Sequence, residues 1–298
     1  MFNIDSTFTL NNGVKMPALG FGVFQASPEE TVTSVKEAIR TGYRLIDTAS
    51  VYGNEHEVGE AIRQSGVDRN DLFVTTKVWI SEYGYDDTLY GFERSMRKLG
   101  LEQLDLYLMH WPVPRDWERS VDTWKAMVRL YEEGRIKAIG VSNFEPEHIE
   151  RLAQITSVLP AVNQVELHPY FNQSDLRAYH KTRGIITQAW SPLGGVNIYE
   201  SAKNHFTRSV LEDAVLEGIA SRHGKSTAQV ILRWHLQHGT AVIPKSVKPA
   251  RIAQNADLFD FQLSDEEMLA IDNLNTGLRG GHVPDEGDRN LFPAVVTD

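Results

Sequence analysis

The chain of 298 residues contains no cysteine, which excludes disulfides and thiolate metal sites and is typical of a reducing compartment. It has no apolar run long enough to cross a bilayer, and its first residues lack the basic and apolar regions of a secretory signal. The chain is acidic: it has 30 Lys and Arg residues and 40 Asp and Glu residues, which gives a formal net charge of -10. Such a chain is unsuited to broad binding of nucleic acid or anionic membranes, so an anionic ligand would need a local basic pocket. We expect a cytoplasmic protein with no nucleic-acid partner and no membrane association.

What the sequence does contain is a regular alternation of strand and helix patterns. A short hairpin with an Asn-Gly turn within residues 1–16 comes first. Short apolar runs, bounded by turn residues, then predict eight strands. These strands are Ala18–Phe21, Arg44–Asp47, Leu72–Lys77, the stretch that starts at Leu104, Ile136–Val141, Ala161–Glu166, Ile185–Trp190 and Ala241–Ile243.

Amphipathic segments between and after these strands predict the helices. They are Glu29–Arg40, Glu55–Arg63, Asp86–Lys98, Trp117–Glu132, Glu147–Ile155, Asp175–Thr182, Val210–Arg222, Thr227–Gln237, Ala250–Ala256 and Asp265–Asn273, the last with Ser264 as its N-cap. Residues 275–298 are rich in Gly and Pro and are expected to form an irregular tail.

Eight strand–helix pairs without a linker predict one (β/α)8 TIM barrel, an α/β fold, over residues 1–298. A doubly wound sheet is the alternative. It is disfavoured because no G-x-G-x-x-G motif opens a helix: Gly20 and Gly22 are followed by Gln25 where the third glycine would stand.

Four polar residues stand at the carboxyl ends of the second, third and fourth predicted strands or, for Tyr52, in the loop just beyond the second, where barrels place their active sites. They are Asp47, Tyr52, Lys77 and His110. Each has an ordinary alternative, as a helix cap, a half-buried aromatic, a surface cation or a structural histidine. Together they suit proton transfer to a carbonyl oxygen, since an ammonium beside Tyr52 would lower the pKa of its hydroxyl. Asp47 would hold Lys77 charged, and His110 would orient the carbonyl.

Three longer segments carry a family resemblance. Residues 42–49 with Tyr52 to Glu55 and Gly59, residues 134–144, and residues 243–246 with Arg251 and Asn255 resemble the signatures of the aldo-keto reductases. The overall likeness is greatest to the bacterial 2,5-diketo-D-gluconate reductase-like members. The resemblance implies a barrel whose bottom is closed by the initial hairpin, and NADPH as cofactor. It also implies that the four polar residues form the catalytic tetrad, with Tyr52 as proton donor.

The resemblance assigns further residues by their match to the family's motifs. Ser142, Asn143 and Gln164 would bind the nicotinamide carboxamide, and Trp190, where many relatives carry Tyr, would stack on the ring. The loop Ser191–Leu193, including Ser191 and Leu193, would follow the pyrophosphate, with Gly22 also at the cofactor. Lys245, Ser246 and Arg251 would hold the adenosine 2′-phosphate and Asn255 the adenine, which supplies the basic pocket that an acidic chain requires. His168 is expected to be structural.

The predicted activity is NADPH-dependent reduction of aldehydes and ketones, with no metal. Phe24, Val51, Trp79 and Trp111 would form an apolar wall suited to small carbonyls, dicarbonyls or keto-sugars. Two alternatives remain at this point: an NADPH-binding regulatory module with little turnover, and a lyase that forms a Schiff base at Lys77. The family resemblance also implies a monomer.

Overall fold

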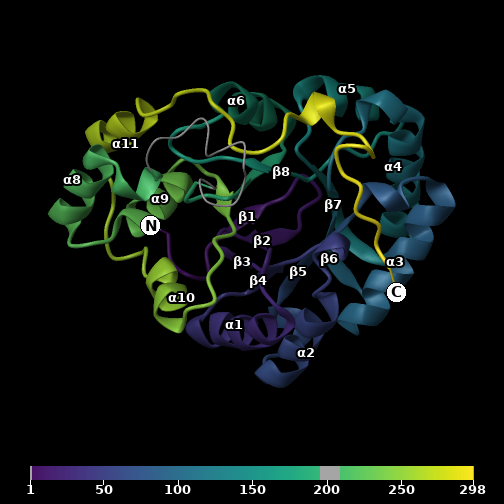
Figure 1. Ribbon diagram of the computed structural model, residues 1–298, viewed down its shortest axis with the longest axis horizontal. Helices are drawn as coiled ribbons and strands as arrows, with labels where there is room; N and C mark the ends of the chain where they lie inside the picture. Colours follow the sequence, from purple (N-terminus) through teal and green to yellow (C-terminus); the bar gives the residue numbers. More distant parts are fainter. Residues whose placement is uncertain (1, 195–208, 298) are drawn as a thin grey trace.

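The computed structural model describes residues 2–194 and 209–297, in which eight parallel strands form a barrel surrounded by helices (Figure 1). The strands are hydrogen-bonded in the order β10-β9-β8-β7-β6-β5-β4-β3. Val242 closes the ring, because it forms a parallel bridge with Leu19 and its N–H donates to the Ala18 carbonyl at 3.0 Å. The strands are β3 Gly20–Gly22, β4 Leu45–Asp47, β5 Phe73–Val78, β6 Leu104–Met109, β7 Ile136–Ser142, β8 Val162–Glu166, β9 Ile186–Trp190 and β10 Ala241–Val242. The predicted barrel is confirmed.

The helices lie outside the strands and bury the apolar stripes that the sequence shows. They are α1 Pro28–Thr41, α2 Glu55–Ser65, α3 Tyr85–Leu99, α4 Trp117–Glu132, α5 Pro146–Ala153, α6 Ser174–Arg183, α8 Ala214–His223, α9 Thr227–Gln237, α10 Pro249–Ala256 and α11 Asp265–Asp272. Ser264 caps α11 as predicted, since its hydroxyl accepts the Glu267 N–H. None of the helices in the described part of the chain is long and apolar enough to span a membrane.

Some predicted boundaries differ from the observed ones. The expected helix over 210–222 is interrupted: a 3-10 turn at Val210–Glu212 is followed by an extended Asp213, and α8 begins only at Ala214. The side chain of Asp213 accepts the Val215 N–H at 2.9 Å, so it caps α8 instead of continuing the preceding turn. The first barrel strand, β3, begins at Gly20, where pairing with Leu45 of β4 starts, although Ala18 and Leu19 just before it already pair with Val242 of β10.

The N-terminal hairpin closes the amino end of the barrel, as the resemblance implied. Its strands, β1 Thr7–Thr9 and β2 Lys15–Pro17, pair antiparallel and are visible through the middle of the barrel in Figure 1. Leu10 and Met16 of this hairpin are buried. They belong to the same apolar cluster as side chains from the strands, which are Leu45, Phe73, Leu106, Leu108, Ala138, Val162 and Ala241.

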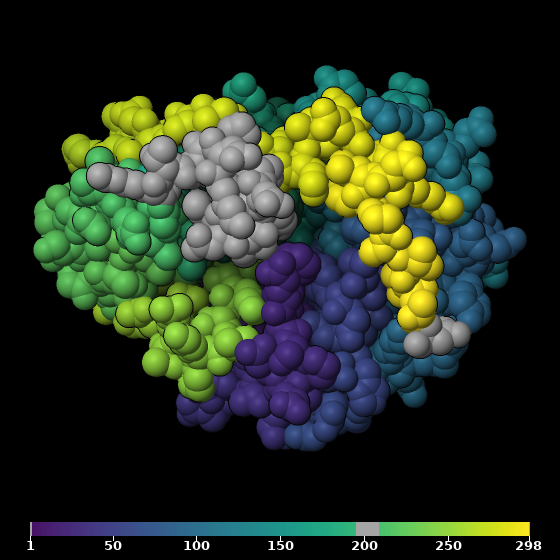
Figure 2. Space-filling view, in the orientation of Figure 1, coloured from purple at the N-terminus to yellow at the C-terminus, as the bar shows by residue number. Residues whose placement is uncertain are grey.

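The described part of the tail after residue 275, residues 276–297, is irregular apart from one 3-10 turn, Pro284–Glu286, and it lies over the active-site face. Figure 2 shows this yellow segment along one edge of the hollow on that face. Long-range contacts fix it. Trp79 donates its indole N–H to the Ala294 carbonyl at 2.8 Å, and Asp288 pairs with Arg115 at 2.8 Å.

Candidate active site

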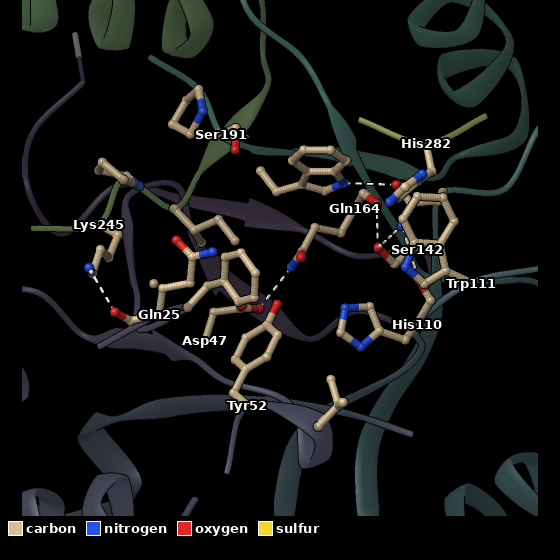
Figure 3. Close-up of a pocket in the computed structure, with 18 of the residues that line it drawn as sticks. Gln25, Asp47, Tyr52, His110, Trp111, Ser142, Gln164, Ser191, Lys245 and His282 are labelled. Atoms are coloured by element: carbon tan, nitrogen blue, oxygen red, sulfur yellow. Dashed lines mark hydrogen bonds between the residues drawn. The ribbon is translucent and has the colours of Figure 1, made fainter. Parts of the chain in front are cut away.

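A cavity of about 470 Å³ opens at the carboxyl ends of the strands. Figure 3 shows Lys245 and Gln25 at one end of it, Trp111 and His282 at the other, and Asp47 and Tyr52 between them. Most of the residues predicted from the sequence line this cavity. These are Gly22, Phe24, Asp47, Val51, Tyr52, Trp79, His110, Trp111, Ser142, Asn143, Gln164, Trp190, Ser191, Leu193 and Lys245.

Lys77 is fully buried, does not itself line the cavity, and is held by two acceptors. Its ammonium donates to Asp47 Oδ1 at 2.5 Å and to the Thr48 carbonyl at 2.9 Å. Burial lowers the pKa of Lys77 and raises the pKa of Asp47, while the attraction between the two opposes both shifts. The ammonium stands 5.1 Å from the centre of the Tyr52 ring. A positive charge at this place favours the phenolate form of Tyr52.

His110 follows β6 and packs edge-on against Tyr52, with ring centres 5.6 Å apart. Trp79 contacts the same imidazole, with ring centres 4.9 Å apart. Burial and the nearby charge of Lys77 lower the pKa of His110 well below its ordinary value. The imidazole is therefore neutral at pH 7, so it can donate one N–H to a carbonyl oxygen without carrying charge. Its Nδ1 has no hydrogen-bond partner among the residues that the structure describes.

The three residues predicted to bind a carboxamide form a hydrogen-bonded wall at the ends of β7 and β8. Ser142 donates its hydroxyl to the Gln164 carbonyl at 2.7 Å, and Asn143 donates its amide to the His110 carbonyl at 3.0 Å. Gln164 donates to Asp47 Oδ2 at 2.7 Å, which joins this wall to the buried ion pair. Trp190 donates its indole N–H to Asn143 Oδ1 at 2.8 Å and so fixes the orientation of that amide.

Three lining residues that are not glycine have backbone conformations with positive φ. They are Gln25 at 58°, Asn143 at 64° and Ser191 at 45°. Such conformations cost about 1–3 kcal/mol each and are found mainly where the surroundings impose them, often at ligand sites. They lie in loops that follow three different strands, so the strain surrounds the cavity.

The basic residues predicted to bind phosphate lie around the start of α10. Lys245 lines the cavity and approaches the Gln25 carbonyl at 3.4 Å, and Ser246 accepts the backbone N–H of Lys248 at 3.1 Å. Arg251 is exposed, whereas Asn255 is buried, and neither of them lines the cavity. The first turn of α10 carries no acidic residue, so the helix dipole and these cations together favour an anion.

Several lining residues were not predicted, and the most informative come from the tail. His282, Phe292 and Ala294 all line the cavity. Phe292 packs on Trp79 and Trp111, with ring centres at 5.5 and 4.9 Å. An aromatic residue within a segment rich in Gly and Pro was the signal that could have indicated this contact. Gln25, Gly194, Ile243 and Pro244 are the other lining residues that were given no role from the sequence, whereas Pro192 lies within the predicted loop Ser191–Leu193.

Comparison with known proteins gives a consistent result. The aldo/keto reductase family model matches residues 18–276. Morphine 6-dehydrogenase of Pseudomonas putida is 52% identical over 288 residues, which cover 96% of this chain and 97% of that protein. Glyoxal reductase of Bacillus subtilis is 49% identical over 285 residues, covering 95% of this chain and 98% of that protein. Among solved structures, a mutant of Gox0644 in complex with NADPH aligns with a TM-score of 0.87 and 44% identity, covering 95% of this chain and 99% of that one.

Proposed function

The chain belongs to the aldo/keto reductase family, and on that premise we propose that it reduces small aldehydes, ketones, dicarbonyls or keto-sugars to alcohols, with Tyr52 as the proton donor. It is an NADP-dependent oxidoreductase. The observation that carries the proposal is the grouping of Tyr52 with the buried pair of Lys77 and Asp47 and with a neutral His110 at one cavity.

The residues present fit NADPH. Lys245 lies at one end of the cavity and His110 lies away from it, towards the other end, as Figure 3 shows, which matches a ligand with a phosphate end and a reactive end. At the reactive end Ser142, Asn143 and Gln164 offer hydroxyl and amide groups to the carboxamide, and the ring of Trp190 offers a flat face. Ser191, Leu193 and Gly22 would follow the pyrophosphate. At the other end Lys245, Ser246 and Arg251 would hold the 2′-phosphate, with Asn255 near the adenine.

The cofactor, when bound, would supply a hydride for the carbonyl carbon of the substrate. Tyr52 donates its hydroxyl proton to the carbonyl oxygen, which becomes the alcohol, and a proton from solvent later restores Tyr52. Lys77 stabilises the phenolate that this transfer leaves, and Asp47 keeps the ammonium in position. His110 donates a hydrogen bond that orients the carbonyl. Phe24, Val51, Trp79 and Trp111 line the cavity, and we expect their apolar surface to surround the reacting carbon and limit water there.

The two alternative functions have no support in the geometry. A Schiff base at Lys77 requires an accessible, neutral amine, whereas Lys77 is fully buried and hydrogen-bonded to Asp47 and to the Thr48 carbonyl. A regulatory module without turnover would not need the grouped tetrad.

Oxidation of NADPH, followed by absorbance with a panel of aldehydes, dicarbonyls and keto-sugars, tests the proposal. We expect turnover with NADPH and a loss of roughly 10²–10⁴-fold for Tyr52→Phe with little change in NADPH affinity. The matched control is Tyr107→Phe, since Tyr107 is equally a tyrosine of the barrel but is fully buried and outside the cavity lining. Binding of NADPH without turnover on any substrate would favour the regulatory module. That the protein is a monomer and is cytoplasmic stays a prediction. Gel filtration tests whether it is a monomer.

A further inference from the structure

We propose that Glu166 is a positioning residue for the C-terminal segment, and that the segment it fixes presents His282 to the substrate as a hydrogen-bonding group. His282 then selects carbonyl compounds that carry a further oxygen, such as a hydroxyl or a second carbonyl, over hydrocarbon aldehydes of similar size. This inference deepens the proposed reductase function and rests on it.

Glu166 ends β8 and binds the tail through both of its carboxylate oxygens. Oε1 accepts the backbone N–H of Gly280 at 2.6 Å, and Oε2 accepts the backbone N–H of Gly281 at 2.8 Å. The imidazole of His168 contacts Oε1 at 3.0 Å. Burial alone would raise the pKa of Glu166, but the hydrogen bond and charge of His168 and the two backbone amides outweigh it and lower the pKa. A buried carboxylate therefore holds a segment 114 residues further along the chain.

The attachment is also close to the predicted cofactor site. A Cβ added to Gly281 would lie 2.8 Å from Trp190 Cη2 and 3.0 Å from Glu166 Oε2, so the tail can lie against both only because residue 281 has no side chain. Glu166 and Trp190 are paired residues on the neighbouring strands β8 and β9. The position of the tail is thus tied to the carboxyl ends of the strands that carry the cofactor residues.

His282 directly follows this attachment and lines the cavity. Figure 3 shows its ring beside Trp111. The imidazole contacts the rings of Trp111 and Phe292 edge-on, with centres 6.4 and 5.2 Å apart. The His282 side chain is exposed and forms no hydrogen bond or ion pair with the residues that the structure describes, so both ring nitrogens are open to solvent or to a ligand.

The other side chains at the substrate end of the cavity explain why the hydrogen-bonding capacity of His282 would matter to a substrate. Once the tetrad and the predicted cofactor residues are set aside, the side chains around the substrate end are largely apolar. They are Phe24, Val51, Trp79, Trp111 and Phe292. A second oxygen of the substrate that enters an apolar wall without a hydrogen-bond partner loses its hydration uncompensated. Trp111 offers an indole N–H at this end of the cavity, which can only donate. His282 adds a group that can also accept from a hydroxyl, whereas Gln25 lies at the other end, beside Lys245.

Selectivity between two substrates tests the role of His282. We would measure kcat/KM with NADPH for glyceraldehyde, which carries two hydroxyls beyond its aldehyde, and for butanal, a hydrocarbon aldehyde of similar length. In His282→Phe, which retains an aromatic ring, the ratio of the two values is expected to fall about tenfold, mainly through KM for glyceraldehyde, as for the loss of one good hydrogen bond. An unchanged ratio would overturn the proposal, and so would a wild-type enzyme that does not favour glyceraldehyde.

The role of Glu166 is tested by a double-variant cycle. Glu166→Gln replaces one acceptor by an amide N–H, which cannot accept from a glycine N–H, so the ratio should fall as it does in His282→Phe. Because both changes act through one group, the double variant should lose no more than the larger single loss. If instead the fold-losses in the ratio for the two single variants multiply in the double variant, Glu166 does not act through His282. If Glu166→Gln fails to fold, Gly281→Ala displaces the same segment and is expected to give the same fall.

This experiment separates the inference from the function on which it rests. Reduction of butanal without selectivity for glyceraldehyde overturns the role of His282 and leaves the reductase intact. An absence of NADPH-dependent reduction of either aldehyde, and of every carbonyl in the broader panel, contradicts the proposed function itself.

Discussion

Replacing Asp47 by Asn tests whether Lys77 is held as a buried ammonium. The substitution keeps the shape of the side chain but removes the charge that faces Lys77 Nζ at 2.5 Å, and leaves the Thr48 carbonyl at 2.9 Å as the remaining strong acceptor. Removing one partner of a buried ion pair costs about 3–5 kcal/mol, because it leaves an uncompensated charge. Since the Thr48 carbonyl and the amide oxygen of the Asn can still accept from Lys77, we expect a loss of about 3 kcal/mol, a large part of the roughly 5–15 kcal/mol that stabilises a native protein.

Urea unfolding followed by tryptophan fluorescence measures this loss. With an m-value of about 3 kcal/mol/M, the midpoint should fall by about 1 M. Burial already lowers the pKa of Lys77 and Asp47 opposes that shift, so the substitution lowers this pKa further. The unfolded chain then binds more protons than the folded one, and the stability of the variant should recover as pH rises through the folded-state pKa.

The double variant Asp47→Asn/Lys77→Met provides the decisive control. If the penalty comes from the unpaired ammonium, removing that ammonium should restore most of the lost stability, because apolar replacement of a buried pair is often neutral. A double variant as unstable as Asp47→Asn alone would refute this reasoning. The cost would then lie in the hydrogen bond that Asp47 accepts from Gln164 at 2.7 Å.

Three further predictions concern the cofactor and His110. Arg251→Ala should weaken NADPH binding about tenfold, as for the loss of one charged hydrogen bond, and should change NADH binding little. Lys248→Ala is the control at a neighbouring cation. Equal losses of affinity for both cofactors would mean that Arg251 does not bind the 2′-phosphate. Because burial and the charge of Lys77 lower the pKa of His110, the imidazole stays neutral, and a plot of kcat/KM against pH should show no inflection at about pH 6.5. An inflection there that His110→Asn abolishes would contradict this. Trp190→Phe keeps a ring but loses the hydrogen bond to Asn143. NADPH titration should show about fivefold weaker binding, and unchanged affinity would mean that this bond does not orient the amide.

The grouping of the tetrad could be predicted from the sequence because it depends on strand order and strand ends alone. β4 ends at Asp47, β5 ends one residue after Lys77, and β6 ends one residue before His110. An error of one residue in a strand boundary does not move such side chains away from the carboxyl end of a barrel. The structure brings the four residues together, while their individual roles stay predictions.

The substrate end of the cavity could not be predicted in the same way. The tail has no periodic pattern, and its position depends on contacts with residues far away in the sequence, such as the bonds from Gly280 and Gly281 to Glu166. A Glu near a strand end is equally compatible with a surface position. The interruption at Asp213 was missed for a related reason, since a side-chain cap competes with the helix only when the chain around it is already in place.

The positive-φ residues show where local preference and tertiary structure disagree. Asn tolerates this conformation, but Ser and Gln rarely adopt it, so nothing at Ser191 or Gln25 in the sequence indicates it. Their surroundings impose it: Ser191 accepts the Gly194 N–H at 2.9 Å, and Gln25 offers its carbonyl to Lys245. Because these residues lie in the loops that surround the cavity, the backbone strain is located where both backbone and side chains would contact a ligand. A barrel scaffold of regular strands and helices can therefore be deduced from hydrophobic pattern, whereas the course of the backbone at the cavity rim follows from contacts that only the folded molecule contains.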